Sequence, residues 1–399
     1  MKKVVIILVI ILIIAAIGIG VYFGLQKSNT SGNNLNNQIS GGNLPIGSTG
    51  NSSTTGVSGG NTNTGNLGNM SDEEKYLENQ KNKLSIFSTQ PIIGYWVVAS
   101  SSTSTPSRIL AVTLKGEVVE IKDGKEEILI SSNYGVPLKL VSNKDGSKAV
   151  VSFANNSYAL FDVSTKAWQE LDKGIVAIAF APTGSQLIYV KSSDNTSSFY
   201  IKDFGSTKKT VTLVASLAIQ DFNITWPDAN KIFIIPKPSY GFMAQAWYFD
   251  LKQKTLNQFA MGQGLGMVFS PSFDFGLKFS NKDRSNFNVS IINKTGEVLA
   301  DMPFSTLSFK CSFEYEKKLA FCAIPESYTQ NNPLLPDEYL KGAVMSLDSI
   351  YKIDLDSSEI TEVINSNVTS IDFSDIKAMG GYLYFINKYD GLLYRFKLD

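Results

Sequence analysis

Apolar and polar residues alternate with a period of two through most of the chain, from Ile92 to the C-terminus. The apolar runs are short and rich in β-branched and aromatic residues, and turns of Asp, Asn, Gly and Ser separate them. Such runs are typical of β-strands with at least one buried face. No amphipathic helix of useful length interrupts them, so the pattern predicts an all-β domain.

A longer repeat lies over this alternation. Each unit contains an apolar strand, a tight turn, a second strand and a third strand that ends in a polar turn. The first turns are centred near Asp145, Thr183, Asp228, Phe273, Glu316 and Gly380. Most of these steps are about 40 to 45 residues, the period of a four-stranded propeller blade. With Arg108 to Lys125 added at the start, the sequence predicts a seven-bladed β-propeller.

The last unit, Tyr382 to Asp399, ends at its third strand. A ring must pair every strand edge, because an open edge is an aggregation site. We therefore expect residues 85–91 to supply the missing outer strand, so that the propeller domain spans residues 85–399.

The residues Phe180 to Val190, FAPTGSQLIYV, resemble the F-S-P-D-G-x-x-[IL]-x-[FY] core of the TolB-type, WD-like β-propeller repeat. Phe269-Ser270-Pro271 and Trp226-Pro227-Asp228 resemble its opening. TolB proteins are soluble and periplasmic, with an α/β domain ahead of the propeller. In this chain an apolar segment and a linker take the place of that domain.

The apolar segment is Val4 to Leu25, which contains no charged residue. As a helix it measures about 33 Å, enough to cross a hydrocarbon core of about 30 Å. It is longer than the core of a cleaved signal peptide. Lys2 and Lys3 precede it and only Lys27 follows it, which favours a cytoplasmic N-terminus. We expect residues 1–27 to be a signal anchor that leaves the propeller extracytoplasmic, at the cell surface or in the periplasm.

Residues 28–70 carry no charge and consist mainly of Gly, Asn, Ser and Thr, a composition typical of a disordered linker. A short helix is predicted over residues 71–84. Ser71 and Glu74 have the spacing of a capping box. Tyr76 and Leu77 are the side chains that this helix offers for packing.

Composition excludes several classes of chemistry. The 36 basic residues balance the 36 acidic ones, so no global positive field favours nucleic acid. Histidine is absent, which excludes Ser-His-Asp catalysis and histidine-ligated zinc. Two cysteines are too few for a cysteine-only metal site. We expect no cofactor, no metal and no catalytic residue that can be named.

The two cysteines, Cys311 and Cys322, flank a predicted hairpin with its turn between Glu316 and Lys317. They should lie opposite each other, at a separation that permits a disulfide. Two buried thiols that pack as small apolar side chains are an equal alternative.

Two long loops interrupt the repeat. Pro325 to Ser346 lies between the second and third strands of the sixth unit, and Pro236 to Ala246 lies in the fourth. If both emerge on one face, their large apolar residues form a binding rim. These residues are Tyr240, Phe242, Met243, Tyr328, Leu334, Leu335 and Tyr339. The alternative is that these side chains fold back and cover their own blades.

The sequence thus favours a membrane-tethered binding or scaffold module that presents a propeller to a cell-envelope protein or polymer. An envelope enzyme acting on glycans or peptides is the alternative. A cluster of carboxylate or Arg side chains at the mouth of the central channel would favour the enzyme.

Overall fold

A computed structural model describes residues 70–99, 108–122, 124–204, 211–314 and 317–398 of the chain. All of these residues belong to one compact unit, which begins at residue 66. The predicted signal anchor and nearly all of the predicted linker therefore lie outside the described residues. Within the described ranges, no helix has the length and apolar character needed to cross a bilayer.

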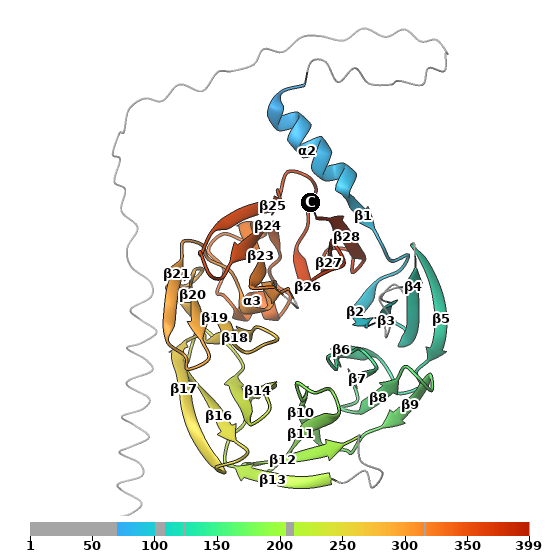
Figure 1. Cartoon of the computed structure of the whole chain (residues 1–399), viewed down its shortest axis with the longest axis vertical. Helices are drawn as coiled ribbons and strands as arrows, with labels where there is room; N and C mark the ends of the chain where they lie inside the picture. Colours follow the sequence, from blue (N-terminus) through green and yellow to red (C-terminus); the bar gives the residue numbers. More distant parts are fainter. Residues whose placement is uncertain (1–69, 100–107, 123, 205–210, 315–316, 399) are drawn as a thin grey trace, which may run out of the picture. The chain divides into compact units, whose positions relative to one another are not determined.

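The described residues between 84 and 397 form seven four-stranded antiparallel sheets arranged as a propeller (Figure 1). The prediction of an all-β, seven-bladed propeller is confirmed. The strands of the first three blades are β2 (Ile92–Val98), β3 (Arg108–Thr113), β4 (Glu117–Lys122) and β5 (Lys125–Ser131); β6 (Pro137–Ser142), β7 (Lys148–Phe153), β8 (Tyr158–Asp162) and β9 (Ala167–Glu170); β10 (Ile175–Phe180), β11 (Gln186–Ser193), β12 (Thr196–Asp203) and β13 (Val211–Leu217).

The remaining blades follow the same order, with the first strand nearest the centre of the ring. Their strands are β14 (Phe222–Asp228), β15 (Lys231–Pro236), β16 (Met243–Asp250) and β17 (Thr255–Gln263); β18 (Gly266–Phe269), β19 (Phe275–Asn281), β20 (Phe287–Asn293) and β21 (Val298–Met302); β22 (Cys311–Phe313), β23 (Leu319–Tyr328), β24 (Ser346–Asp354) and β25 (Ile360–Ile364); β26 (Phe373–Met379), β27 (Tyr382–Asn387) and β28 (Leu393–Lys397). A 3-10 helix, η2 (Ser308–Lys310), leads into β22, and a short helix, α3 (Asp337–Leu340), lies between β23 and β24.

The seventh blade closes the ring with a strand from the start of the domain. β1 (Leu84–Ile86) pairs antiparallel with β28, so that Ser85 lies opposite Arg395. Residues close to the predicted 85–91 therefore supply the outer strand. The strand is shorter than that range, because the chain turns toward β2 after Ile86 and buries Phe87 between blades 7 and 1.

The core lies between the blades. Each of seven buried apolar clusters joins side chains of two neighbouring blades, and together they cover all seven boundaries of the ring. The middle strands of a blade therefore bury both faces, as in β3 and β27, where five of the six residues are buried. The outer strand β5, by contrast, has no buried residue. This explains why the middle strands read as continuous apolar runs in the sequence.

The helix α2 (Asp72–Lys83) precedes β1, and Ser71 and Glu74 form the predicted capping box. Its packing differs from the prediction in part, since Leu77 is half-buried but Tyr76 is 44% exposed. Gln80 is its buried residue, and its side chain accepts a hydrogen bond from the backbone N–H of Asn365 at 2.8 Å. Tyr76 is largely exposed and donates to Glu362 at 3.1 Å. The helix thus meets the outer strand of blade 6 through polar groups, which apolar patterning does not reveal.

Candidate functional site

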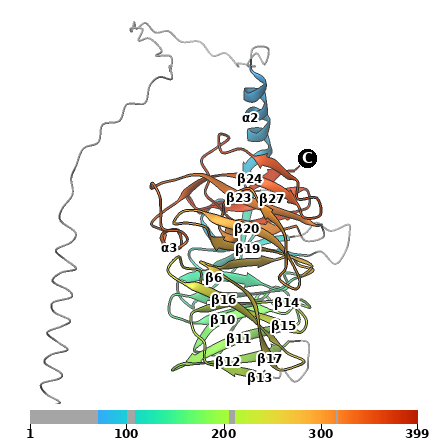
Figure 2. The same cartoon turned by 90° about the vertical axis from the view of Figure 1, so that its left-hand side faces the viewer.

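The two long loops lie together on one face of the propeller. The first connects β15 to β16 (residues 237–242), and the second connects β23 to β24 (residues 329–345) and contains α3. Asp337 of α3 accepts hydrogen bonds from Ser239 Oγ at 2.7 Å and from the backbone N–H of Tyr240 at 2.8 Å. In the edge-on view α3 lies at one face of the ring (Figure 2). We call the two loops, together with the adjoining strand residues Tyr328 and Met243, the rim.

The second loop is fastened to several blades besides its own. Arg284, between β19 and β20 of blade 5, donates to the backbone carbonyl of Asn332 at 3.0 Å. Ser285 donates to the carbonyl of Pro333 at 2.8 Å. Together with Asp337, these contacts join the loop to blades 4 and 5. A loop held at this many points is ordered before any partner binds, which lowers the entropy cost of binding.

The apolar residues of the rim fall into two groups. Phe242 is 71% exposed and Met243, the first residue of β16, is 66% exposed. Tyr240, Tyr328 and Leu334 are half-buried. Leu340 of α3, which sequence reasoning missed, is also exposed. A short helix in an irregular loop leaves no periodic signal by which Leu340 could have been found.

Leu335 and Tyr339 are not part of the exposed surface. Leu335 is fully buried in the core between blades 5 and 6, and Tyr339 stacks on Phe309 with ring centroids 5.3 Å apart. The expectation that both residues contribute to an exposed rim is therefore wrong. They cover their own blades, because the loop must bury apolar surface to stay folded on the propeller.

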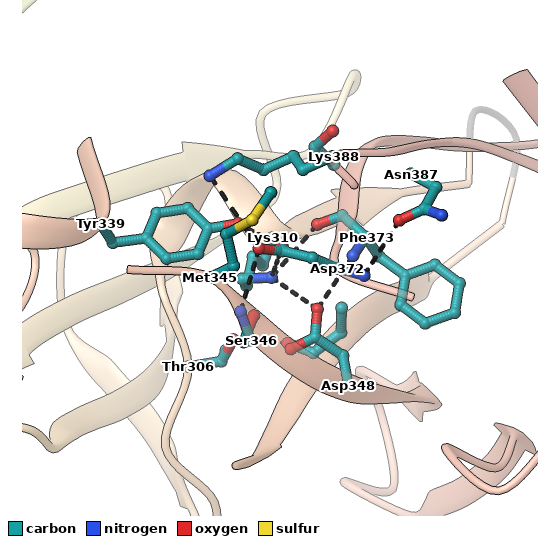
Figure 3. A network of polar contacts seen from close by, with 12 residues as sticks. Thr306, Lys310, Tyr339, Met345, Ser346, Asp348, Asp372, Phe373, Asn387 and Lys388 are labelled. Carbon is teal, nitrogen blue, oxygen red and sulfur yellow. Dashed lines mark hydrogen bonds and ion pairs between the residues drawn. The ribbon is translucent and has the colours of Figure 1, made fainter. Parts of the chain in front are cut away.

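Beneath the rim lies a network of charged side chains without solvent access (Figure 3). Lys310, Asp348 and Asp372 are each 0% exposed. Lys310 Nζ lies 2.5 Å from Asp348 Oδ2 and 2.7 Å from Asp372 Oδ1. Lys310 ends η2 before blade 6, Asp348 is in β24, and Asp372 directly precedes β26 of blade 7. We call these three residues the buried charge cluster.

The cluster also holds α3. The hydroxyl of Tyr339 donates to Asp372 Oδ1, and the backbone N–H of Ser346 donates to Asp372 Oδ2 at 3.0 Å. Burial and the neighbouring Asp372 carboxylate raise the pKa of Tyr339, so its hydroxyl stays protonated and remains a donor. The network therefore joins the second loop to blade 7 as well.

Sequence reasoning did not find the buried charge cluster. Asp348 and Asp372 lie 38 and 62 positions after Lys310, and no motif relates the three residues. The available signal is Asp348, two residues before Ile350 and on the same face of the strand SLDSIYKID, since a charged residue at a buried strand position needs a partner.

Cys311 and Cys322 are direct cross-strand partners in β22 and β23, as the hairpin predicted. Their sulfur atoms are bonded in the structure. The disulfide lies next to Lys310 in sequence, so blade 6 carries a covalent link and the buried charge cluster at adjacent positions.

Two cavities lie away from the rim. One of about 410 Å³ is bordered by α2, blade 6 and blade 7, and another of about 140 Å³ by the inner part of blades 2, 3 and 4. None of the predicted binding residues lines either cavity. Within the described ranges, no three His, Cys, Asp or Glu side chains are grouped in a way that could hold a metal ion.

Known proteins similar to this chain were found only among solved structures. No protein-family model and no curated protein sequence matches the chain. Among solved structures, TolB from Acinetobacter baumannii is similar over 68% of this chain and 63% of its own, with 14% sequence identity and a TM-score of 0.44. The chain therefore spans less than two thirds of that TolB chain.

Two further solved structures are similar. Kuenenia stuttgartiensis hydrazine synthase matches with 16% identity and a TM-score of 0.50, over 68% of this chain and 79% of its own. An oligogalacturonate lyase in complex with manganese matches with 11% identity and a TM-score of 0.49, over 79% and 90%. At these identities the likeness concerns the propeller fold alone.

Proposed function

We propose that the chain is a membrane-tethered binding or scaffold module, which presents its propeller outside the cytoplasm to a protein or polymer of the cell envelope. The segment Val4 to Leu25 would be the anchor, and residues 28–70 the linker. The rim would be the contact surface. A propeller is consistent with this role, because its rigid blades position loops for binding.

One observation carries the proposal. Phe242 and Met243 expose large apolar side chains on a loop that Asp337 fixes through two hydrogen bonds. Large apolar side chains that are held in place and well exposed are typical of the residues that dominate protein interfaces. Neither side chain has a role in the core of its own blade.

Chemical cross-linking in intact cells tests the proposal. The full chain is treated with a reagent that does not cross membranes, purified, and its cross-linked partners are identified. The rim variant is Phe242→Ser with Met243→Ser. We expect the wild-type chain to capture a defined envelope protein or polymer, and the rim variant to lose at least about 90% of it, because an interface centre contributes several kcal/mol.

The matched control is Val298→Ser with Leu299→Ser. These adjacent residues are also about half exposed, but they lie on the outer strand of blade 5. The control should capture as much partner as the wild-type chain. Equal losses in both variants would contradict a specific role for the rim. Degradation of an envelope glycan or peptide without any capture would favour the enzyme alternative.

A further inference from the structure

Lys310 and Asp348 are arranged as two reactants in a dry pocket. Both side chains are 0% exposed, and Lys310 Nζ lies 2.5 Å from Asp348 Oδ2. A second carboxylate, that of Asp372, lies 2.7 Å from the same nitrogen. Phe373 follows Asp372 and is also fully buried, so apolar surface borders the pocket.

An ion pair in this pocket carries a high free-energy cost of desolvation. Removing a carboxylate and an ammonium from water costs several kcal/mol for each ion, and their mutual attraction often fails to offset that cost. Asp348 shows the imbalance, because its Oδ1 has no hydrogen-bond partner within the described ranges. A neutral amide between the two side chains would remove both buried charges.

We propose that Lys310 and Asp348 join in an intramolecular isopeptide bond, formed by the folded chain itself with Asp372 as the proton carrier. The two side chains would lose one molecule of water. No oxidant, metal or cofactor is needed, because the reaction is a condensation of an amine with a carboxylic acid.

The contacts supply each step of the reaction. Asp348 Oδ2 accepts one proton from Lys310 Nζ, which leaves the amine neutral, and the lone pair of the amine attacks Cγ of the protonated Asp348. Asp372 Oδ1 then accepts the second proton, from the nitrogen of the tetrahedral intermediate. The backbone N–H of Phe373 donates to Asp348 Oδ2 at 2.9 Å and holds that oxygen beside Lys310.

The C–N bond forms first, and the C–Oδ2 bond of the tetrahedral intermediate then breaks. Oδ2 keeps the electron pair of that bond and leaves as water, with the proton that it took from Lys310 and the proton that Asp372 returns. Oδ1 becomes the carbonyl oxygen of the amide. Both protons originate from the ammonium of Lys310, so Asp372 ends as it began. Burial raises the pKa of Asp348 against the opposing effect of Lys310, which favours the protonated acid that this step requires.

After the bond forms, the negative charge of Asp372 is still paired. Lys388 Nζ lies 4.0 Å from Asp372 Oδ2, so the Asp372 carboxylate keeps a cation after Lys310 becomes neutral. Asp372 also keeps its hydrogen bonds from Tyr339 and the backbone of Ser346. Formation of the bond therefore does not leave Asp372 as an unpaired charge in the core.

The bond would tie η2 to the third strand of blade 6 and enclose the whole second rim loop in a covalent ring. The disulfide of the adjacent Cys311 ties the first strand to the second. Blade 6 would then be the one blade of the described domain with two cross-links, and it carries the insertion.

The same chain contains a control pair. Lys148 and Asp162 of blade 2 are in direct contact, as Lys310 and Asp348 are, but their side chains are 21% and 26% exposed. Water stabilises that ion pair in its charged form, and within the described ranges no second carboxylate hydrogen-bonds to Lys148. The proposal predicts a bond at the buried pair and none at the exposed pair.

Mass spectrometry of the purified full chain tests the proposal. After reduction of the disulfide, the intact mass should fall below the sequence mass by one water molecule. Peptide mapping should then recover one branched peptide that joins Lys310 to Asp348, and ordinary peptides for Lys148 and Asp162. A reduced chain with the full sequence mass, or a water loss that maps elsewhere, overturns the proposal.

Variants separate the role of each group. Lys310→Met should show the full mass of its own sequence. Asp348→Asn should still form the bond by releasing ammonia, and should reach the same final mass as the wild-type chain. Asp372→Asn should leave most of the chain without the bond when measured soon after purification.

Folding is checked in each variant by its β-sheet circular dichroism. If a variant fails to fold, the wild-type mass and the peptide map still decide. If folded Asp372→Asn forms the bond as fast as the wild-type chain, Asp372 is not the proton carrier.

Discussion

Gly146 shows how a single residue holds two blades together. It lies in the first turn of blade 2 with a φ of +71°, and its carbonyl accepts a hydrogen bond from the indole N–H of Trp96 in blade 1 at 3.0 Å. An added Cβ would lie 1.8 Å from the backbone oxygen of Val97. The turn therefore needs glycine for its conformation and for the close approach of blade 1.

We predict that Gly146→Ala destabilises the domain by about 3 kcal/mol or more, through backbone strain and overpacking. Gly174→Ala is the matched control, because Gly174 has a φ of +78° but nothing within 4 Å of its added Cβ. Strain alone should cost the control about 1 kcal/mol. Chemical denaturation of the three proteins measures both values, and equal losses would show that the contact with Val97 contributes nothing.

Asp162 gives a prediction for pH. Burial raises its pKa, but hydrogen bonds from Lys148 and Ser164 outweigh burial and lower the value from 3.8 to about 2. Because the folded pKa lies below the unfolded value, the stabilisation is present above about pH 4 and is lost as the pH falls toward 2. Asp162→Asn should therefore reduce stability by about 1 to 2 kcal/mol at pH 7, and by much less near pH 2.

Urea denaturation at several pH values measures this difference. In a Lys148→Gln background the same substitution should have a smaller effect, since the partner charge is gone. A difference of the same size at pH 7 and pH 2 would contradict the assignment.

At the residue scale, the sequence shows which side chains are apolar but does not predict whether an irregular loop exposes or buries them. Phe242 and Leu335 are both large apolar residues on long loops, yet one is exposed and the other is buried. Whether each side chain is exposed or buried depends on which neighbouring loop it meets. The loop that contains Leu335, for example, is held by a hydrogen bond from Arg284 to the carbonyl of Asn332. Contacts between residues so far apart in sequence leave no local signal.

At the element scale, the strands were predictable because each blade repeats one pattern of turns and apolar runs. The middle strands bury both faces against neighbouring blades, so their β-branched and aromatic runs are strong signals. The second rim loop was predictable as an interruption of the repeat. Its inner helix α3 and its attachments to blades 4, 5 and 7 were not, since they depend on the closed ring.

The short strand β1 carries a prediction of its own. Residues 87–399 lack β1 and α2, so the outer edge of β28 would be unpaired. Compared with residues 66–399, this shorter chain should unfold several degrees lower and should form oligomers through the open edge. Thermal unfolding and light scattering measure the two effects. Equal melting temperatures and a monomeric shorter chain would show that β1 does not close the ring energetically.

At the scale of the whole molecule, the core is distributed over seven boundaries between blades rather than concentrated in one place. A ring of this kind leaves its loops free to vary while the blades stay rigid. The rim uses that freedom, because the second loop adds contacts to three other blades without changing the strand order. We therefore propose that a partner binds this rim and not the outer strands.

The most direct test places a photoreactive amino acid at position 242 of the full chain in living cells, and at position 299 in a second strain. Position 242 lies on the rim, and position 299 is a similarly exposed site on the outer strand of blade 5. We predict a defined cross-linked product with an envelope component from position 242 and none from position 299. A product from position 299 with none from position 242 would contradict the rim as the binding surface.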